Sequence, residues 1–167
     1  MPNVPQSERV RFRRYMLGDA DALFHVFADP YARRFYPQME VPAKVLKWIE
    51  WNLDNYERYG FGLWALEDEA GKFLGDCGLT YQEVELRKEL EIGYHVIEGE
   101  RGKGYATEAA RACLDYGLTN TPAAMICSIV DPRNAASIAV AARIHTFRRD
   151  FLRPNGLRHL FYTLRDE

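Results

Sequence analysis

Cysteine is scarce in this 167-residue sequence, which contains only Cys77, Cys113 and Cys127. The three lie far apart and form no Cys-x-x-Cys pair, which argues against a zinc ribbon or a redox dithiol. Disulfides persist mainly in oxidising compartments, and an odd number of widely spaced thiols gives no disulfide framework. We therefore expect three reduced, buried thiols in a cytoplasmic protein that uses no metal.

Long apolar runs and an excess of charge of one sign are also missing. No apolar segment reaches the ~18 residues that a membrane span requires, and residues 1–12 lack the apolar core of a signal peptide. The 22 Lys and Arg residues nearly balance 24 Asp and Glu residues, for a formal net charge of −2. This balance argues against a strongly basic surface, so we expect neither nucleic acid nor a membrane as a partner.

Repeats, low-complexity tracts and Gly/Ser-rich linkers are absent as well, so nothing divides the sequence. The length is that of one ordinary domain, and we expect residues 1–167 to form a single domain around one core. A chain of this size buries roughly 68–70% of the surface that its unfolded form exposes, enough to fold without a disulfide or a metal. Monomer and homodimer both remain open.

The apolar pattern predicts an α+β fold with a mixed sheet. Helices are expected between Gly18-Asp19 and Asp29-Pro30, from Pro42 to Gly60, from the loop 98–104 to about Leu118, and from Asn134 to Ile144. Strands are expected at 61–66, 72–80, 90–97 and 123–130, and a hairpin around Asn155-Gly156. The helix after the loop has a small inward face, which permits close approach to a sheet.

The loop 98–104 is the most informative segment, because it follows a predicted strand and opens a predicted helix. The first turn of such a helix presents unpaired backbone N–H groups and the positive end of the helix dipole, and both attract phosphate. Gly102 and Gly104 have no Cβ to hold a phosphate away from the backbone. Arg101 and Lys103 add positive charge at the rim.

Three classes of phosphate loop compete for this segment. A P-loop is excluded by sequence, because Gly102-Lys103 is followed by Gly104 rather than Ser or Thr. The dinucleotide fingerprint is matched only in its first half, since Thr107 stands where the third glycine or alanine belongs. Asp131 could imitate the ribose-binding acid, although it lies farther along the chain than the ~20 residues expected. A dinucleotide-binding module therefore remains an alternative.

The third class is matched by Arg101, Gly104 and Ala106, which have the Arg/Gln-x-x-Gly-x-Gly/Ala spacing of the GNAT superfamily of acyl-CoA-dependent N-acyltransferases. Downstream, Asn134 and Ser137 resemble the Asn-x-x-Ser motif at the start of the next helix in that superfamily. The resemblance covers most of the chain and is closest to the RimJ/RimL-like branch of ribosomal-protein N-terminal acetyltransferases. Less specific similarities to this branch lie at 19–23, 29–30 and 60–65.

The resemblance implies a single GNAT domain with a splayed, mostly antiparallel sheet of about seven strands and about four helices. It implies acetyl-CoA in the cleft, with the pyrophosphate on the amides of residues 101–106 and the pantetheine beside the strand at 90–97. The oxyanion donor would be an N–H within Tyr94–Val96. The expected coenzyme contacts are Tyr94, Val96, Ile97, Arg101, Gly102, Lys103, Gly104, Tyr105, Ala106, Thr107, Asn134 and Ser137.

Catalysis in such an enzyme requires a route for the amine proton rather than a covalent nucleophile. Alternation along the strand places Glu91 and His95 on its more polar face, so both are candidates. They lie roughly 13 Å apart along an extended strand, too far to act on one atom. Ser137 is the candidate acid, because Ala141 occupies the place of the tyrosine that many members use. Trp64, together with Tyr94, is a candidate for the acceptor pocket.

One further position departs from the family pattern: either His145 replaces the usual glycine or a residue has been lost there. We expect an N-acetyltransferase that moves acetyl from acetyl-CoA directly to a primary amine, either a peptide N-terminus or a small molecule. A coenzyme A-binding sensor without turnover is a second alternative, suggested by Ala141. The identity of the acceptor is not encoded in any motif.

Overall fold

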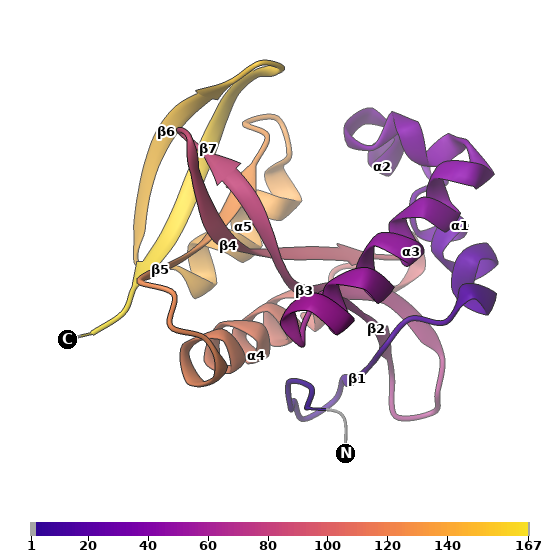
Figure 1. Ribbon diagram of the computed structural model, residues 1–167. Coiled ribbons are helices and arrows are strands. Elements are labelled where there is room, and N and C mark those ends of the chain that lie inside the picture. The colour runs from indigo at the N-terminus through magenta and orange to yellow at the C-terminus, as the bar shows by residue number, and fades with distance from the viewer. Residues whose placement is uncertain (1–2, 167) are drawn as a thin grey trace.

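The computed structural model describes residues 3–166, in which seven strands form one mixed sheet (Figure 1). The strands lie in the order β1-β2-β3-β4-β5-β7-β6, and within these residues only β4 and β5 run parallel. Their bounds are β1 Arg11–Arg13, β2 Leu63–Glu67, β3 Phe73–Val84, β4 Arg87–Val96, β5 Met125–Val130, β6 Phe147–Arg153 and β7 Gly156–Leu164. The expected sheet, including the final hairpin, is confirmed.

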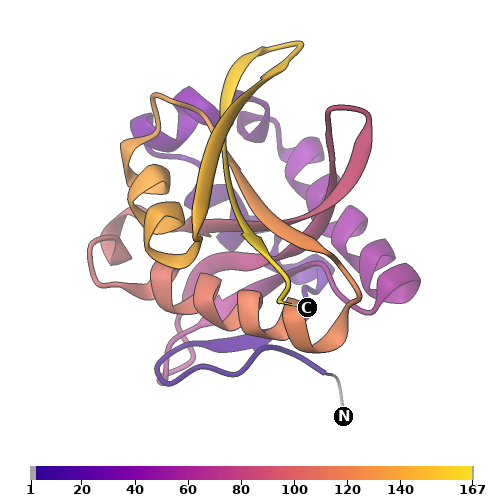
Figure 2. The ribbon, with the colours of Figure 1, turned by 90° about the vertical axis from the view of Figure 1, so that its left-hand side faces the viewer.

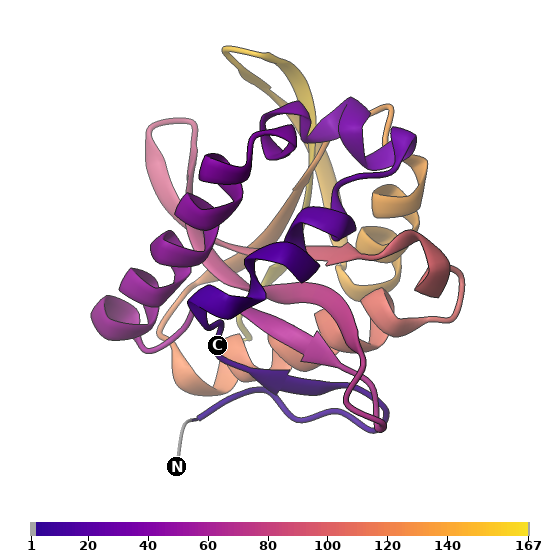
Figure 3. The same ribbon diagram turned by 90° about the vertical axis from the view of Figure 1, so that its right-hand side faces the viewer.

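Helices cover both faces of the sheet. Figure 3 shows α1 (Ala20–Val26), α2 (Pro30–Phe35) and α3 (Pro42–Tyr59) on one face. Figure 2 shows α4 (Tyr105–Asn120) and α5 (Ala135–Ile144) on the other. Short 3-10 turns occupy Leu17–Asp19, Pro37–Glu40 and Glu98–Glu100. No helix in the described part of the chain is long and apolar enough to cross a membrane.

Helix α2 is one helix more than the sequence predicts. Asp29-Pro30 was expected to end α1, but α1 already ends at Val26, and the pair instead starts α2. The Asp29 side chain accepts a hydrogen bond from the Ala32 N–H at 3.0 Å, and Pro30 takes the first helical position, where its missing N–H costs nothing. The helix brings Tyr31 and Phe35 over the site described below.

The small inward face of α4 packs closely against the sheet, as predicted. A Cβ at Gly117 would lie 2.7 Å from the end of the Ile126 side chain, so a larger residue would require that side chain to move. Cys113 lies on the same helix face, and its Sγ is 3.6 Å from that of Cys77. All three cysteines are free and buried, so the expected burial of the thiols is confirmed.

The sheet opens between its two parallel strands. β4 pairs with β3 over residues 75–84, but with β5 only at Leu90↔Ile126 and Glu91↔Cys127. Beyond these pairs the carboxyl ends of β4 and β5 diverge, and each leads to the N-terminus of a helix, α4 or α5. Unpaired backbone at the carboxyl ends of parallel strands is the usual location of a ligand site.

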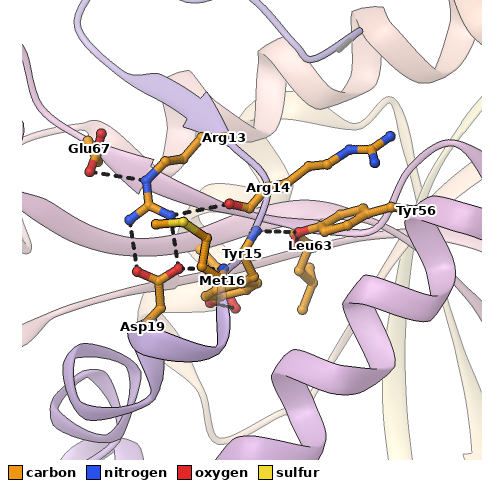
Figure 4. Close-up of polar contacts among 9 residues, drawn as sticks. Arg13, Arg14, Tyr15, Met16, Asp19, Tyr56, Leu63 and Glu67 are labelled. Atoms are coloured by element: carbon orange, nitrogen blue, oxygen red, sulfur yellow. Dashed lines mark hydrogen bonds and ion pairs between the residues drawn. The ribbon is translucent and has the colours of Figure 1, made fainter.

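Side chains at and just after β1 hold this edge strand against the rest of the fold (Figure 4). The Arg13 guanidinium donates to both oxygens of Asp19, at 2.8 and 2.9 Å, and its Nε donates to Glu67 at 3.1 Å. The next residue but one, Tyr15, donates its N–H to the Tyr56 hydroxyl of α3 at 3.1 Å. These contacts fix Tyr15, whose hydroxyl reaches the centre of the sheet.

Candidate active site

Six consecutive backbone N–H groups, those of Gly102 to Thr107, donate to no acceptor in the part of the chain that the structure describes. They lie at the start of α4, where the helix dipole adds positive potential. Gly102 and Gly104 adopt left-handed conformations with φ of 78° and 83°, which favour glycine. A turn with this many unpaired amides fits a diphosphate group.

Arg9 completes this turn and was missed by sequence reasoning. Its Nη1 donates to the Lys103 carbonyl at 3.0 Å, and its guanidinium lies 4.7 Å from the centre of the Tyr105 ring. Its Nε donates to Glu108 at 2.7 Å, so the N-terminal segment is held on α4. A Cβ at Gly104 would lie 3.3 Å from Arg9 Nη2. Nothing near Arg9 in the sequence signals this contact, which spans more than ninety residues.

The two cations expected at the rim of the turn are each paired with a carboxylate. Arg101 donates to both oxygens of Asp29, at 3.0 and 2.8 Å, and its Nε donates to the Val96 carbonyl at 2.8 Å. Lys103 Nζ lies 2.8 Å from Glu100. The Arg101 side chain therefore joins α2 to the end of β4, and it also borders the loop cavity.

Two cavities meet at the opening between β4 and β5. The loop cavity, of about 110 Å³, includes Val96, Arg101 and Ala106 in its lining, and the hairpin cavity, of about 380 Å³, includes Glu91, Arg153 and Arg158. Six residues border both: Phe35, Tyr36, Tyr94, His95, Asn134 and Ser137. The second volume lies in the range typical of small-molecule sites.

Glu91 lies in the hairpin cavity, at the point where the strands separate. Its Oε2 accepts a hydrogen bond from the Ile129 N–H of β5 at 2.8 Å, so the side chain replaces a lost ladder bond. Burial raises the pKa of the Glu91 carboxyl to about 7, although the Ile129 hydrogen bond and the charge of Arg153 act in the opposite direction. A carboxyl with this pKa can accept and release a proton near neutral pH.

His95 lies in a buried network on the same strand. Its Nδ1 is 2.6 Å from Asp76 Oδ1, and its Nε2 is 3.0 Å from the Tyr36 hydroxyl. The Asp76 carboxylate also accepts from the Tyr15 hydroxyl at 2.7 Å and from Trp48 Nε1 at 3.0 Å. An ionised carboxylate can only accept, so Nδ1 is the ring nitrogen that can donate to it; the unprotonated Nε2 of that tautomer can then accept from the Tyr36 hydroxyl.

Of the two aromatic residues that the sequence suggests for the acceptor pocket, Tyr94 borders both cavities and Trp64 borders neither. Trp64 is fully buried and packs edge-on against Phe12 and Tyr116, so it borders neither cavity. Tyr36 and Trp48 instead surround His95, with ring centres 4.9 and 5.4 Å away. The first four residues of β2 are all buried, so the alternation of side chains along this strand does not show which of them face the core and which face a cavity.

Tyr94 connects β4 to α5 and borders both cavities. Its hydroxyl donates to the Ser137 carbonyl at 2.7 Å and accepts from Ser137 Oγ at 3.1 Å. The carbonyls of Ile92 and Val96 bond toward the open side of β4, to Ser128 Oγ and to Arg101. Alternation therefore points the Tyr94 N–H into the same opening, where it has no strand partner.

Asn134 caps α5 and also contributes to the cavities. Its Oδ1 accepts from the Ser137 N–H at 3.2 Å, the expected cap, and from the Tyr31 hydroxyl at 2.6 Å. Of the other expected contacts, Val96 and Ala106 border the loop cavity, whereas Ile97 and Tyr105 pack against the core. The structure thus brings together the loop, the end of β4 and the start of α5.

The departure at His145 is structural in this fold. Ser128 Oγ donates to the Ile92 carbonyl, so it accepts from His145 Nε2 at 2.9 Å, and Nδ1 lies 2.9 Å from Thr163 Oγ1. Burial lowers the pKa of His145 to about 4. Neither cavity borders His145, so it joins α5 to β5 and β7 rather than contacting a ligand. Ala141, one turn earlier, is fully buried.

These features define a class of enzyme. Unpaired amides that fit a diphosphate lie beside the loop cavity, which Ala106 borders, and the Glu91 carboxyl lies in the hairpin cavity. The chain belongs to the acetyltransferase (GNAT) domain family, which it matches over residues 9–146. It is therefore an acetyltransferase with the GNAT fold. The family expected from the motifs is confirmed, and it replaces the dinucleotide-binding alternative.

The chain is similar in sequence or in fold to several known proteins. The chain is 39% identical over 140 residues to the uncharacterized protein YkkB of Bacillus subtilis (strain 168), covering 83% of this chain and 81% of YkkB. The acetyltransferase from Agrobacterium tumefaciens str. C58 superposes with a TM-score of 0.79 at 25% identity, over 96% of this chain and 94% of that one. RimL, a ribosomal L7/L12 alpha-N-protein acetyltransferase, has the same fold, with a TM-score of 0.77 at 18% identity over 97% of each chain.

Proposed function

We propose that this acetyltransferase belongs to the RimJ/RimL-like branch, works in the cytosol, and transfers acetyl from acetyl-CoA to a primary amine by direct attack in a ternary complex. The observation that carries the proposal is the joining of the two cavities at Tyr94 and Ser137. One cavity is bordered by Ala106, one of the residues with unpaired amides, and the other is bordered by Glu91. The similar structure of RimL contains coenzyme A. A peptide N-terminus and a small-molecule amine are both acceptors of the required kind.

In this proposal each group has one task. The amides of residues 102–107 bind the diphosphate, and the Tyr94 N–H stabilises negative charge on the acyl oxygen. Glu91 accepts the proton of the attacking amine, directly or through water. Acetyl-CoA supplies the activated acyl group as a thioester.

Two further residues complete the proposed site. We assign the return of a proton toward the departing sulfur to Ser137, whose Oγ already shares a hydrogen bond with the Tyr94 hydroxyl. His95, the second candidate for the proton route, has both ring nitrogens engaged. We therefore assign it a positioning role, in which it holds the Tyr36 hydroxyl at the junction of the cavities.

Ligand-dependent thermal stability tests the proposed coenzyme. Acetyl-CoA and coenzyme A should each raise the melting temperature, because a ligand that binds only the folded protein stabilises it by about 2.7 kcal/mol at about 100 times its Kd. NAD should give no such shift. Thiol release with a panel of primary amines then tests turnover: stabilisation without turnover would favour the coenzyme A-binding sensor, and stabilisation by NAD alone would end the proposal.

The variant Gly104→Val should lose the acetyl-CoA shift, because a branched side chain at φ 83° would distort the turn and cover its amides. Gly71→Val is the matched control. Gly71 has a similar φ of 86° in the turn between β2 and β3, where a Cβ would meet no atom within 4 Å. Both variants should destabilise the protein, but only the Gly71 variant should retain the shift. An unchanged shift in the Gly104 variant would show that the turn does not bind the coenzyme.

The pH dependence of kcat/KM should report the ionisation of Glu91. Burial raises the pKa of this carboxyl, so it is protonated and unable to accept a proton below about pH 7. After correction for ionisation of the acceptor amine, kcat/KM should rise about tenfold per pH unit below that value and level off above it. A profile that stays flat from pH 5 to pH 7 would contradict the assignment.

A further inference from the structure

The hairpin cavity is lined on one side by arginine. Arg153 ends β6 and Arg158 lies near the start of β7, and both border the same cavity as Glu91. The positive charge of Arg153 opposes the rise that burial causes in the pKa of the Glu91 carboxyl across this cavity. The only acids in the cavity lining are Glu91 and Asp131.

Asp131 is already paired with a cation outside the lining. Arg133 donates to both of its oxygens, at 3.1 and 2.8 Å, and these hydrogen bonds lower the pKa of Asp131 to about 2. Arg158 Nη2 lies 3.9 Å from the same carboxylate, beyond hydrogen-bond distance. Arg133 therefore already balances the negative charge of Asp131, so the positive charges of Arg153 and Arg158 remain in excess in the cavity.

Among residues 3–166, the two arginines have only carbonyl oxygens as hydrogen-bond partners. Arg153 Nη2 donates to the Glu83 carbonyl at 3.0 Å, and Arg158 Nη1 donates to the Leu157 carbonyl at 2.8 Å. No carboxylate of residues 3–166 lies within 4.0 Å of the Arg153 guanidinium. The Arg158 side chain is only 16% exposed, so water reaches little of it. A guanidinium has five donors in a planar fork suited to a carboxylate or a phosphate. Most of these donors point to no protein acceptor.

The cavity thus combines a proton acceptor with an excess of positive charge. Near neutral pH, Glu91 is only partly ionised, whereas both arginines remain charged. An amine that enters with a second positive group would meet like charge at the hairpin. An amine that carries a negative group would pair with it.

We propose that the acceptor is a primary amine that carries an anionic group, which Arg153 and Arg158 bind while the amine lies at Glu91. The proposal rests on the proposed acetyl transfer, and it narrows the acceptors to amino acids, acidic peptide N-termini and amines that bear a phosphate. Polyamines are poor acceptors in this cavity. The Trp48 and Trp51 side of the cavity contacts the apolar part of the same molecule.

The first test compares matched acceptors that differ only in the anion. γ-Aminobutyrate is paired with its amide, and aminoethyl phosphate is paired with ethanolamine. The dipeptide Ala-Glu is paired with Ala-Gln, and both dipeptides carry a C-terminal amide. Spermidine is added as an amine with further positive charges. In each pair the anionic amine should have at least about a tenfold higher kcat/KM, expressed mainly in KM. The three pairs distinguish a free carboxylate, a peptide side chain and a phosphate as the source of the charge.

The second test removes the cations. Arg153→Gln keeps an amide donor for the Glu83 carbonyl but loses the charge, and Arg158→Gln is its counterpart. Each change should reduce the preference for the anionic member of a pair, and the double change should bring the ratio close to one. The assays are run well above the pKa of Glu91, because loss of Arg153 also raises that pKa. Arg149→Gln is the control: Arg149 lies on β6, pairs with Glu85 outside both cavities, and should leave the ratio unchanged.

Binding separates failure of this inference from failure of the proposed function. Calorimetry measures each acceptor pair against the enzyme with coenzyme A present. Turnover without preference for the anion, or a preference that survives the double change, overturns the inference and leaves acetyl transfer intact. Tighter binding of the anionic amine that depends on both arginines supports the inference even if no amine is acetylated, and equal binding of both members overturns it in that case.

Discussion

Glu91→Gln is expected to reduce kcat about 10²- to 10⁴-fold, the usual contribution of a general base, while acetyl-CoA binding stays unchanged. The glutamine keeps the oxygen that accepts the Ile129 N–H, so the two strands remain joined across the opening. It loses only the capacity to take the amine proton. Single-turnover thiol release and acetyl-CoA titration of the same preparation measure the two effects separately.

The same variant is expected to be more stable than the parent protein at alkaline pH. Burial raises the pKa of Glu91 to about 7 in the folded protein, above its ordinary value of 4.5. A raised folded pKa contributes stability below pH 4.5 that is lost as the pH rises through about 7, because the buried carboxyl must then ionise. The neutral amide avoids that cost. Urea unfolding at about pH 8.5 should show a gain on the order of 2 kcal/mol, which disappears at about pH 4.

Glu89→Gln is the matched control for both measurements. Glu89 lies two residues away on β4, pairs with Arg87 at 3.8 Å and borders neither cavity. It should change neither kcat nor the pH dependence of stability. If the Glu91 variant kept full turnover, Glu91 would not lie on the proton route. If the variant were inactive because it was unfolded, Glu91 would be needed for folding rather than for proton transfer.

The parts of the site that could be predicted from sequence are those encoded by neighbouring residues. The turn before α4 needs glycine at its left-handed positions, and Asn134 caps α5 three residues before Ser137. Both requirements leave a signature within a few residues. Glu91 could be found for a related reason, because alternation along one strand places it on the polar face, and the structure places it in a cavity.

The parts that could not be predicted depend on contacts between distant segments. Arg101 was expected at a phosphate, but its guanidinium is held by Asp29, seventy-two residues earlier. Trp64 was expected at the acceptor, but Phe12 and Tyr116 bury it. Tyr36 reaches His95 only because α2 and the turn after it lie over the sheet. No local pattern encodes where a helix lies on a sheet, since packing of the whole core decides it.

Asp76 is the residue most poorly indicated by the sequence and the one with the largest expected effect on stability. It lies in a strand of buried residues and is fully buried itself, although its side chain ends in a carboxyl group. Three donors converge on its carboxylate, from Tyr15, Trp48 and His95. Asp76→Ala should cost about 4 kcal/mol, because it leaves these buried donors without an acceptor.

A second Asp–His pair in the same protein provides the comparison. Asp150 on β6 lies 2.6 Å from His159, the same distance as in the Asp76 pair, but the Asp150 side chain is 46% exposed. Water can replace a lost partner there, so Asp150→Ala should cost under about 1 kcal/mol. Urea unfolding of the two variants, at a pH where both histidines are neutral, measures the difference. Equal losses would mean that the buried network contributes no more than a surface pair.

Asp76→Asn tests whether the network positions Tyr36 as well as stabilising the fold. The asparagine oxygen can still accept from Tyr15 and Trp48, but its NH₂ then faces His95 Nδ1 and requires the opposite tautomer of the ring. Nε2 would then donate to the Tyr36 hydroxyl, which frees the tyrosine proton at the junction of the cavities. We expect a loss of about 1–2 kcal/mol, exchange of the protonated ring nitrogen in ¹⁵N NMR spectra, and a changed kcat with little change in acetyl-CoA affinity. An unchanged tautomer together with unchanged kcat would reduce Asp76 to a purely structural residue.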